Sequence, residues 1–276
     1  MTRYVAAYNV ESPRCLAACR KIVQVHRRRA MPATFFLVGR LLEAKADEWR
    51  RLLDDPLFEV ASHSWSHRTV RDHPFGGTAA RLPRITEEIV RGKAVVEEVF
   101  ERPCLGLRPA GGFPDGLRGA PAVLEVVRDA GLKYLSSQLW GPDFSLPAPL
   151  AQAFPYARDG FPDLWELPGH GWHEDRLKAP QALRPKRLTL WPPVMPEAVP
   201  PAPVETPRQE ADVHRLFLEK AAADGLAYVS LIWRPWSLDR FDPAMEMPDL
   251  VLARAADLGL KPATYGEVYR SLAGAG

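Results

Sequence analysis

The sequence predicts an α/β fold, in which a single barrel of seven or eight parallel strands is surrounded by helices. Short apolar segments rich in β-branched and aromatic residues alternate with longer amphipathic segments. Repeated strand–helix units of this kind imply parallel strands with the helices outside. The length of 276 residues fits such a barrel, and an apolar content of 46% supplies a sizeable core.

The predicted elements follow one another along most of the chain. Strands are expected at residues 4–8, 33–38, 57–61, 105–107, 133–135, 164–167 and 227–233. Helices are expected at residues 41–53, 84–100, 122–130, 209–223 and 250–258, with a last one beginning at Tyr265. A further helix is expected to open at Ser12–Pro13, because serine suits the N-cap and proline the first helical position.

A proline-rich region at about residues 142–207 departs from this alternation. Proline removes a backbone donor and resists both helix and sheet. We expect an insertion on the barrel rim, within a single domain that spans residues 1–276, and a long excursion over residues 178–206. A long ordered loop of this kind is either a lid or binding loop or a plain insertion, and the sequence leaves both open.

The overall charge of the chain indicates which classes of binding partner are unsuited to it. A formal net charge of +2 argues against nucleic acid and against an anionic membrane. The basic run His26–Arg29 lies at the end of a predicted helix, where cations complement the helix dipole. Cys15, Cys19 and Cys104 provide no disulfide framework and are expected in the core. We expect a cytoplasmic location, because neither a signal peptide nor an apolar run of about 18 residues is found.

Polar residues stand where predicted strands end, and in a parallel barrel these ends lie on one face. His63 and His67 follow the third strand and are four residues apart. If the chain turns helical after His63, both imidazoles share one face of the helix. They can then bind one metal ion, and two nitrogen ligands suit zinc or a similar divalent ion.

At this point several motifs together resemble one family, the polysaccharide deacetylases of carbohydrate esterase family 4, with a NodB-type domain. Residues 35–39 (FFLVG) resemble its second strand, and residues 59–67 (EVASHSWSH) are similar to its metal motif. Residues 107–111 (LRPAG), 131–137 (GLKYLSS) and 231–238 (LIWRPWSL) resemble its later motifs. The resemblance implies a distorted, incomplete (β/α) barrel and the metal-dependent removal of an N-acetyl group from an amino sugar.

The resemblance also implies a ligand set for a divalent metal ion, expected to be zinc, with cobalt, nickel or manganese as alternatives. The metal ligands would be His63, His67, Asn9 and Glu11. Asn9 departs from the family pattern, because it stands where an aspartate usually serves as base, and a neutral amide cannot act as one. Glu11 is then the third ligand or the base, and its alternative role is a helix N-terminal charge.

Two arginines complete the expected catalytic group. Arg108 would orient a carboxylate or bind substrate, and a buried structural ion pair is its alternative role. Arg234 stands where the family usually has a histidine as general acid. An arginine stays protonated, so it would instead stabilise an oxyanion or an anionic substrate group. His170 or His173 would then be the replacement proton donor, against the alternative that both are plain loop residues.

Four residues are expected to contact the substrate. Trp172 and Trp236 would form walls of the pocket, since aromatic faces pack well on sugar rings, although core packing is also open to both. Pro109 and Gly111 belong to the arginine motif and are assigned to the same surface.

The sequence thus favours a metal-dependent deacetylase that acts on an amino sugar or a polysaccharide precursor. A catalytically impaired relative that binds carbohydrate or regulates is the first alternative, because the residues at positions 9 and 234 remove both usual proton-transfer groups. A related amidohydrolase acting on another carbon–nitrogen bond is the second alternative. Whether the protein forms an oligomer stays open.

Overall fold

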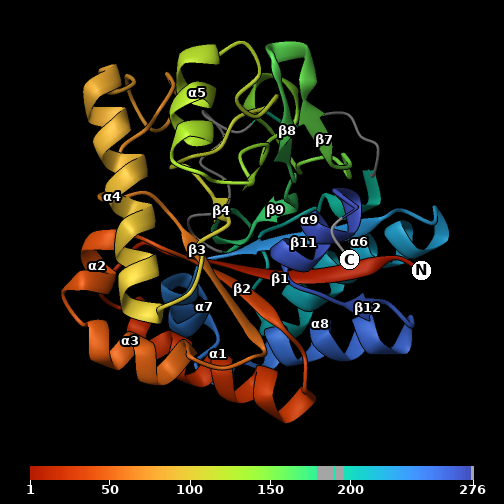
Figure 1. Cartoon of the computed structure of the whole chain (residues 1–276). Helices are drawn as coiled ribbons and strands as arrows, with labels where there is room; N and C mark the ends of the chain where they lie inside the picture. The colour runs from red at the N-terminus through yellow and green to blue at the C-terminus, as the bar shows by residue number, and fades with distance from the viewer. Residues whose placement is uncertain (179–188, 191–195, 275–276) are drawn as a thin grey trace.

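The fold is a mixed α/β half-barrel, described here by a computed structural model for residues 1–178, 189–190 and 196–274 (Figure 1). The main sheet runs in the order β7-β8-β5-β4-β3-β2-β1-β11-β9, with β12 beside β1. Its strands are β1 (Arg3–Val10), β2 (Ala33–Leu37), β3 (Phe58–Ser62), β4 (Gly106–Leu107), β5 (Tyr134–Leu135), β7 (Phe154–Tyr156), β8 (Phe161–Glu166), β9 (His170–His173), β11 (Tyr228–Trp233) and β12 (Lys261–Pro262).

The prediction of a parallel, incomplete (β/α) barrel is confirmed. Every pairing in the main sheet is parallel except that of β7 with β8. The seven predicted strands correspond to β1, β2, β3, β4, β5, β8 and β11, while β7, β9 and β12 were not predicted. Strands β7 and β12 contain proline, and β9 has glycine between polar and aromatic residues, so none of the three has the apolar, β-branched pattern that predicts a strand.

Helices cover the outer face of the sheet (Figure 1). Helices α1, α3 and α8 lie on the side of β1 and β2, and α4 and α5 lie toward β3 and β4. The helices are α1 (Cys15–Arg29), α2 (Gly39–Glu43), α3 (Ala46–Leu53), α4 (Leu82–Phe100), α5 (Pro121–Asp129), α6 (Pro207–Ala223), α7 (Pro235–Phe241), α8 (Glu246–Asp257) and α9 (Tyr265–Leu272). The single helix expected at 41–53 is two helices, and α1 starts at Cys15 without a side-chain cap from Ser12.

The proline-rich region is only partly the insertion that the sequence predicts. Strands β8 and β9 fall inside residues 142–207, yet both belong to the main sheet. Strand β7 contains Pro155 and tolerates it because β7 lies at the sheet edge. The excursion over 178–206 starts and ends at one place, since Lys178 and Val204 form a β-bridge. Residues 179–188 and 191–195 of that excursion lie outside the described residues.

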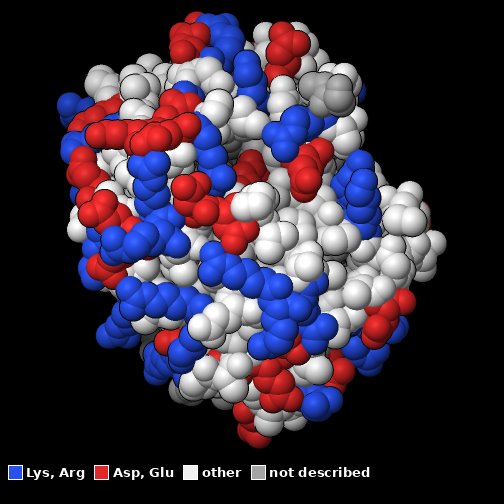
Figure 2. Space-filling view, turned by 60° about the horizontal axis from the view of Figure 1, so that its bottom comes forward, with Lys and Arg blue, Asp and Glu red and all other residues white. Residues whose placement is uncertain are grey.

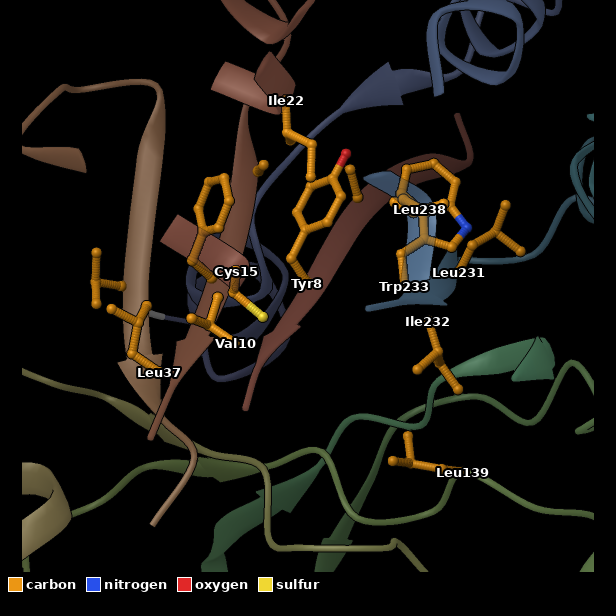
Figure 3. Packing of buried hydrophobic residues seen from close by; sticks show 14 of the residues in the cluster. Tyr8, Val10, Cys15, Ile22, Leu37, Leu139, Leu231, Ile232, Trp233 and Leu238 are labelled. Atoms are coloured by element: carbon orange, nitrogen blue, oxygen red, sulfur yellow. The ribbon is translucent and has the colours of Figure 1, made fainter. Parts of the chain in front are cut away.

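The core lies between the sheet and its helices. Cys15 and Cys19 are fully buried, and Cys104 is nearly so, as predicted. Figure 3 shows Cys15 among Val10, Leu37 and Tyr8 of the packed apolar side chains. All three thiols are free, and burial raises their pKa values, that of Cys15 to about 11.

The charged residues of the face formed by α1 and α8 are interspersed (Figure 2). Arg28 and Arg29 at the end of α1 both pair with Asp249, at 2.8 and 2.5 Å, and Arg27 pairs with Asp55 at 2.9 Å. The basic run of the sequence is therefore matched by acids on this face. Among the described helices, none combines the length and the apolar character that crossing a bilayer requires.

Candidate metal centre

Strand register assembles the site. Val10 pairs with Leu37, Leu37 with Ser62, and Ser62 with Leu107. Because these strands are parallel, the residues that follow them meet at the same edge of the sheet. Those residues include Glu11, His63 and Arg108, and the neighbouring strand β11 ends directly before Arg234.

The two histidines of the third strand meet in a tight loop, and the helix expected after His63 is absent. Ser64 and His67 have left-handed backbones, with φ of 61° and 65°, which a right-handed helix cannot contain. Their rings nevertheless lie with centroids 4.7 Å apart. The two rings are therefore close together although the helical turn, on which the sequence argument was conditional, does not form.

Helix α4 holds this loop in place. A Cβ on Gly92 would lie 2.7 Å from the Ser64 carbonyl carbon, so only glycine allows the loop to approach the helix this closely. The backbone N–H of Trp65 donates to the Glu88 carbonyl at 2.8 Å, and that of Ser66 donates to the Glu88 carboxylate at 2.6 Å. These contacts stabilise a loop whose two left-handed residues would otherwise disfavour it.

Glu11, His63 and His67 form a three-residue cluster that could hold a metal ion, with one ligand atom from each within 4.8 Å of the others. Glu11 Oε2 lies 3.9 Å from His63 Nε2 and 3.5 Å from His67 Nε2. His63 Nδ1–H donates to the Arg108 carbonyl at 2.5 Å, which leaves the lone pair on Nε2. That Nε2 is buried and has no hydrogen-bond partner among the described residues, so the donor set fits a divalent cation.

Neighbouring side chains hold Glu11 as a carboxylate. Its Oε1 accepts from Trp236 Nε1 at 3.0 Å and lies 3.2 Å from Arg234 Nε, while Oε2 turns to the histidines. Burial alone would raise the pKa of Glu11, but Arg234 and the two histidines hold it well below the ordinary value. Burial, helped by the charge of His63, lowers the pKa of His67 to about 4. Glu11 and His67 thus present an ionised carboxylate and a neutral imidazole, which are the forms that bind metal.

Asn9 is engaged elsewhere. Its Oδ1 accepts from Arg108 Nη1 at 2.8 Å, and Arg108 also donates to Ser136 Oγ at 2.9 Å and Tyr265 Oη at 3.0 Å. Arg108 is fully buried, lies over the Phe36 ring at 4.2 Å, and forms no ion pair with an acid in the described part of the chain. Asn9 could therefore bind a metal ion only if its Oδ1 gave up the hydrogen bond from Arg108. Arg108 in turn contacts an amide at the position where the family resemblance implies a carboxylate.

Arg234 is fixed at the centre of a network. Besides Glu11, its guanidinium contacts Asp175 at 2.9 Å and donates to His173 Nδ1 at 3.0 Å. Its backbone N–H donates to the buried Glu174 carboxylate at 3.0 Å. Burial would lower the pKa of Arg234, but Asp175 and Glu11 raise it above the ordinary value, so this side chain is a permanent cation. No motif or spacing in the sequence indicated Asp175 or Glu174.

His170 and Trp172 are corrections, because neither joins this group. His170 accepts from the Ser230 backbone N–H at 2.9 Å and donates to the Ala151 carbonyl at 2.7 Å, so both ring nitrogens are used. Trp172 is buried and donates to the Ala198 carbonyl at 2.8 Å, which makes it a packing residue. Trp236 contacts Glu11 directly, as described above, and its role is to hold that carboxylate.

A pocket of about 230 Å³ borders the cluster. His67 and Arg234 line one part of it, and Gly111 with Trp140 lines another. Gly111 has φ of 82° and its carbonyl accepts from Trp140 Nε1 at 2.7 Å, while Pro109 is buried beside it. The remaining lining residues are Thr69, His73, Phe75, Gly76, Ala110, His173 and Arg176.

Neither Trp140 nor His73 was predicted from the sequence to belong to the site. Both lie in loops without periodic pattern, and only the fold brings them to the pocket. His173 lines the pocket too, but its Nε2–H donates to the Leu139 carbonyl at 2.9 Å while Nδ1 accepts from Arg234. Neither of its ring nitrogens is free to transfer a proton.

Comparison with known proteins relates part of this chain to one family. The family profile described as polysaccharide deacetylase matches residues 13–135. This stretch is a little under half of the chain, and over it the sequence is similar to the polysaccharide deacetylases. No curated protein matches it in sequence.

Solved structures share the fold at low identity. A protein of Mycobacterium smegmatis that is assigned to the polysaccharide deacetylases is 18% identical, with a TM-score of 0.64 over 98% of this chain and 90% of that one. A carbohydrate esterase family 4 pseudoenzyme of Bacillus anthracis, BA3943, is 14% identical, with a TM-score of 0.55 over 97% of this chain and 65% of that one. PuuE allantoinase is 11% identical, with a TM-score of 0.62 over 98% and 88% of the two chains.

Proposed function

We propose that this protein binds a divalent metal ion at Glu11, His63 and His67 and removes an acyl group, in the first place acetyl, from an amino sugar or a sugar-containing precursor. The observation that carries the proposal is the convergence of one ionised carboxylate and two imidazoles, with the buried Nε2 of His63 lacking any other partner among the described residues. Zinc suits two nitrogen ligands and one oxygen ligand, and cobalt, nickel or manganese are the alternatives.

The residues around the cluster would have separate roles. When bound, the ion would lower the pKa of a water molecule and polarise the acyl carbonyl. Glu11 would be a ligand through Oε2, because Oε1 is already held by Trp236 and Arg234. Arg234 lines the pocket and would stabilise negative charge that develops on the acyl oxygen. Three of its contacts are fixed, to Glu11, Asp175 and His173, so its position is set before substrate arrives.

A second function, carbohydrate binding without efficient hydrolysis, is favoured by one specific observation. Asn9 occupies the position next to Arg108 where a base would stand, and an amide cannot take a proton. Arg234 cannot donate one usefully either. Both usual proton-transfer groups are thus absent, and a relative with the same fold, BA3943, is described as a pseudoenzyme with a mutant of restored activity.

Metal content and acetate release together test the first function. The purified protein is loaded with Zn²⁺, dialysed, analysed for metal and incubated with N-acetylglucosamine oligomers, with His63→Ala as the matched control. We expect one ion per chain and acetate release in the wild type, and neither in His63→Ala. Equal acetate release by both proteins, or no bound ion in either, would contradict the proposal.

The variant Asn9→Asp separates the two functions. It places a carboxylate beside Arg108 without changing the size of the side chain, and we expect acetate release to rise by about 100-fold, the scale of general base catalysis. A wild type that binds metal and sugar but releases no acetate, together with an Asn9→Asp variant that does, establishes the binding function. The control is Asn9→Ser, which removes the amide without supplying a base.

A further inference from the structure

A buried carboxylate lies behind the turn that holds Glu11. Glu174 follows strand β9 directly, and His173 of β9 pairs with Ile232 of the parallel strand β11. This register sets Glu174 beside the end of β11, where Arg234 begins the turn into α7. Because Glu174 is fully buried, its charge has to be met by donors from the protein.

Two of these donors belong to that turn. Glu174 Oε1 accepts from the Arg234 backbone N–H at 3.0 Å, and Oε2 accepts from Ser237 Oγ at 2.9 Å. Trp236 lies between the two donors in sequence. The side chains of Arg234 and Trp236 are the ones that contact Glu11 Oε1, at 3.2 and 3.0 Å. One carboxylate therefore fixes the backbone from which both neighbours of Glu11 project.

An ammonium group and a second acid stand behind Glu174. Lys178 Nζ donates to Glu174 Oε2 at 2.6 Å and lies 3.2 Å from Oε1 of Glu210, a residue of α6. The side chains of all three residues are at most 4% exposed. Glu210 Oε1 lies 3.6 Å from His214 Nε2, and Lys178 Nζ lies 5.2 Å from the centroid of the Phe241 ring at the end of α7. This buried network joins α6 to both ends of α7.

The charge of Glu174 depends on Lys178. Burial raises the pKa of Glu174, and the neighbouring acids Asp175 and Glu210 add to the rise. Lys178 is the strongest influence in the opposite direction, so it favours the carboxylate form that accepts from Arg234. A buried ion pair contributes little net stability, because the cost of desolvation offsets the Coulomb attraction. The place of this pair, behind the turn that holds Glu11, therefore points to a role in geometry.

We propose that Glu174 is a positioning residue for the metal centre, which fixes the turn Arg234–Ser237 and through it the arginine and the tryptophan that orient Glu11. The proposal rests on the proposed function in one respect, since it takes Glu11 as a metal ligand. Glu174 is not among the residues that line the pocket. Its effect on the metal centre is therefore transmitted by the turn.

The zinc affinity of two Glu174 variants tests the proposal. Glu174→Leu removes every acceptor, and it leaves no unpaired buried charge, because Lys178 keeps Glu210 as its counter-ion. We expect zinc affinity, measured by competition with a chelating dye, to fall by about tenfold, as for loss of an outer partner of a metal ligand. Glu174→Gln keeps an oxygen for the Arg234 N–H, so its affinity should stay within about threefold of the wild-type value.

The matched control is Glu59→Leu. Glu59 is a carboxylate that likewise accepts from a backbone N–H at the start of a helix, that of Gly266 in α9, at 2.8 Å. It also accepts from the hydroxyls of Thr34 and Tyr134, each at 2.8 Å. Glu59 lies near the amino end of β3, whereas the metal centre lies beyond its carboxyl end. We expect Glu59→Leu to lower the free energy of unfolding and to leave zinc affinity within about twofold of the wild-type value.

Hydrogen exchange in the metal-free protein tests the contact itself. NMR follows the Arg234 backbone N–H, which donates to Glu174, and the Trp236 indole N–H, which donates to Glu11. In Glu174→Leu we expect both groups to exchange about tenfold faster than in the wild type, because local opening of the turn becomes easier. In Glu59→Leu neither rate should change.

Every outcome of these measurements decides the inference. Equal losses of zinc affinity in Glu174→Leu and Glu59→Leu, or unchanged exchange of the two N–H groups in Glu174→Leu, would overturn it. If the wild type binds no zinc, the proposed metal site fails, and exchange of the Trp236 indole N–H then decides whether Glu174 positions Glu11. If the wild type and all the variants bind zinc alike, Glu174 has no positioning role and the proposed metal site stands.

Discussion

Two pairs of histidines in this molecule have similar sequence spacing and different surroundings. His63 and His67 lie in the loop after β3, and His170 and His173 lie in β9. The first pair leaves a buried Nε2 without a partner at the position of Glu11. The second pair uses both nitrogens of each ring for hydrogen bonds to backbone groups and to Arg234. A histidine pair is thus a ligand pair only where the fold leaves a ring nitrogen unused.

Removal of one ring from the first pair has the largest expected effect. In His63→Ala the cluster keeps one imidazole and one carboxylate, and zinc affinity should fall by about 1,000-fold, since even loss of an outer partner costs 10–100-fold. Competition with a chelating dye measures the affinity. An unchanged affinity would place the metal elsewhere.

The corresponding change in the second pair should affect stability and not metal binding. His170→Ala leaves the Ser230 N–H and the Ala151 carbonyl without partners and opens a cavity. We expect the free energy of unfolding, measured in urea, to be about 3 kcal/mol lower than that of the wild type. The zinc affinity of the variant should stay within about twofold of the wild-type value. A His170→Ala protein that loses zinc but keeps its stability would reverse the comparison.

The stability of the second pair should also depend on pH. Burial lowers the pKa of His170 to about 4, below the ordinary value of 6.5, so the unfolded chain binds the proton more readily. Its contribution is therefore present above pH 6.5 and is lost as the pH falls toward 4.

The variant His170→Asn isolates the pH-dependent contribution of His170 to stability, because the Oδ1 of the asparagine does not titrate and can still accept from the Ser230 N–H. Between pH 7 and pH 4.5 it should lose about 2 kcal/mol less unfolding free energy than the wild type. Equal losses, measured by urea titration at the two pH values, would show that His170 does not titrate in this way.

The smallest expected effect comes from removing the hydrogen bond that positions Glu11 beside His63 and His67. Trp236→Phe removes the 3.0 Å hydrogen bond to Glu11 Oε1 and keeps most of the ring. Zinc affinity should fall by about tenfold, the range of an outer-shell partner. Trp172→Phe, which loses a hydrogen bond to the Ala198 carbonyl and not to Glu11, is the matched control and should leave zinc affinity unchanged. A larger loss in the control would mean that Trp236 does not act through Glu11.

The sequence predicted most of the βα elements, because long helices and the central strands carry strong periodic patterns. It failed at β9 and β12, whose sequences HGWH and KP lack a strand pattern, and in the proline-rich region, where an edge strand accommodates Pro155. Strand ends and motif resemblance pointed to His63, His67 and Glu11, which the structure brings together. The sequence could not indicate Trp140, Asp175 or His73, since loop residues meet only through long-range packing.

What the sequence by itself determined is the inventory: parallel βα units, a carboxylate and two imidazoles after their strands, and an amide and an arginine at positions 9 and 234. Periodicity and residue chemistry are local properties, so they can be read without coordinates. Tertiary structure alone decided which nitrogen stays free, because other ring nitrogens donate to the carbonyls of Arg108, Ala151 and Leu139 or accept from the Ser230 N–H. Those partners lie between 19 and 60 residues from the histidines they bind, and only folding brings them together.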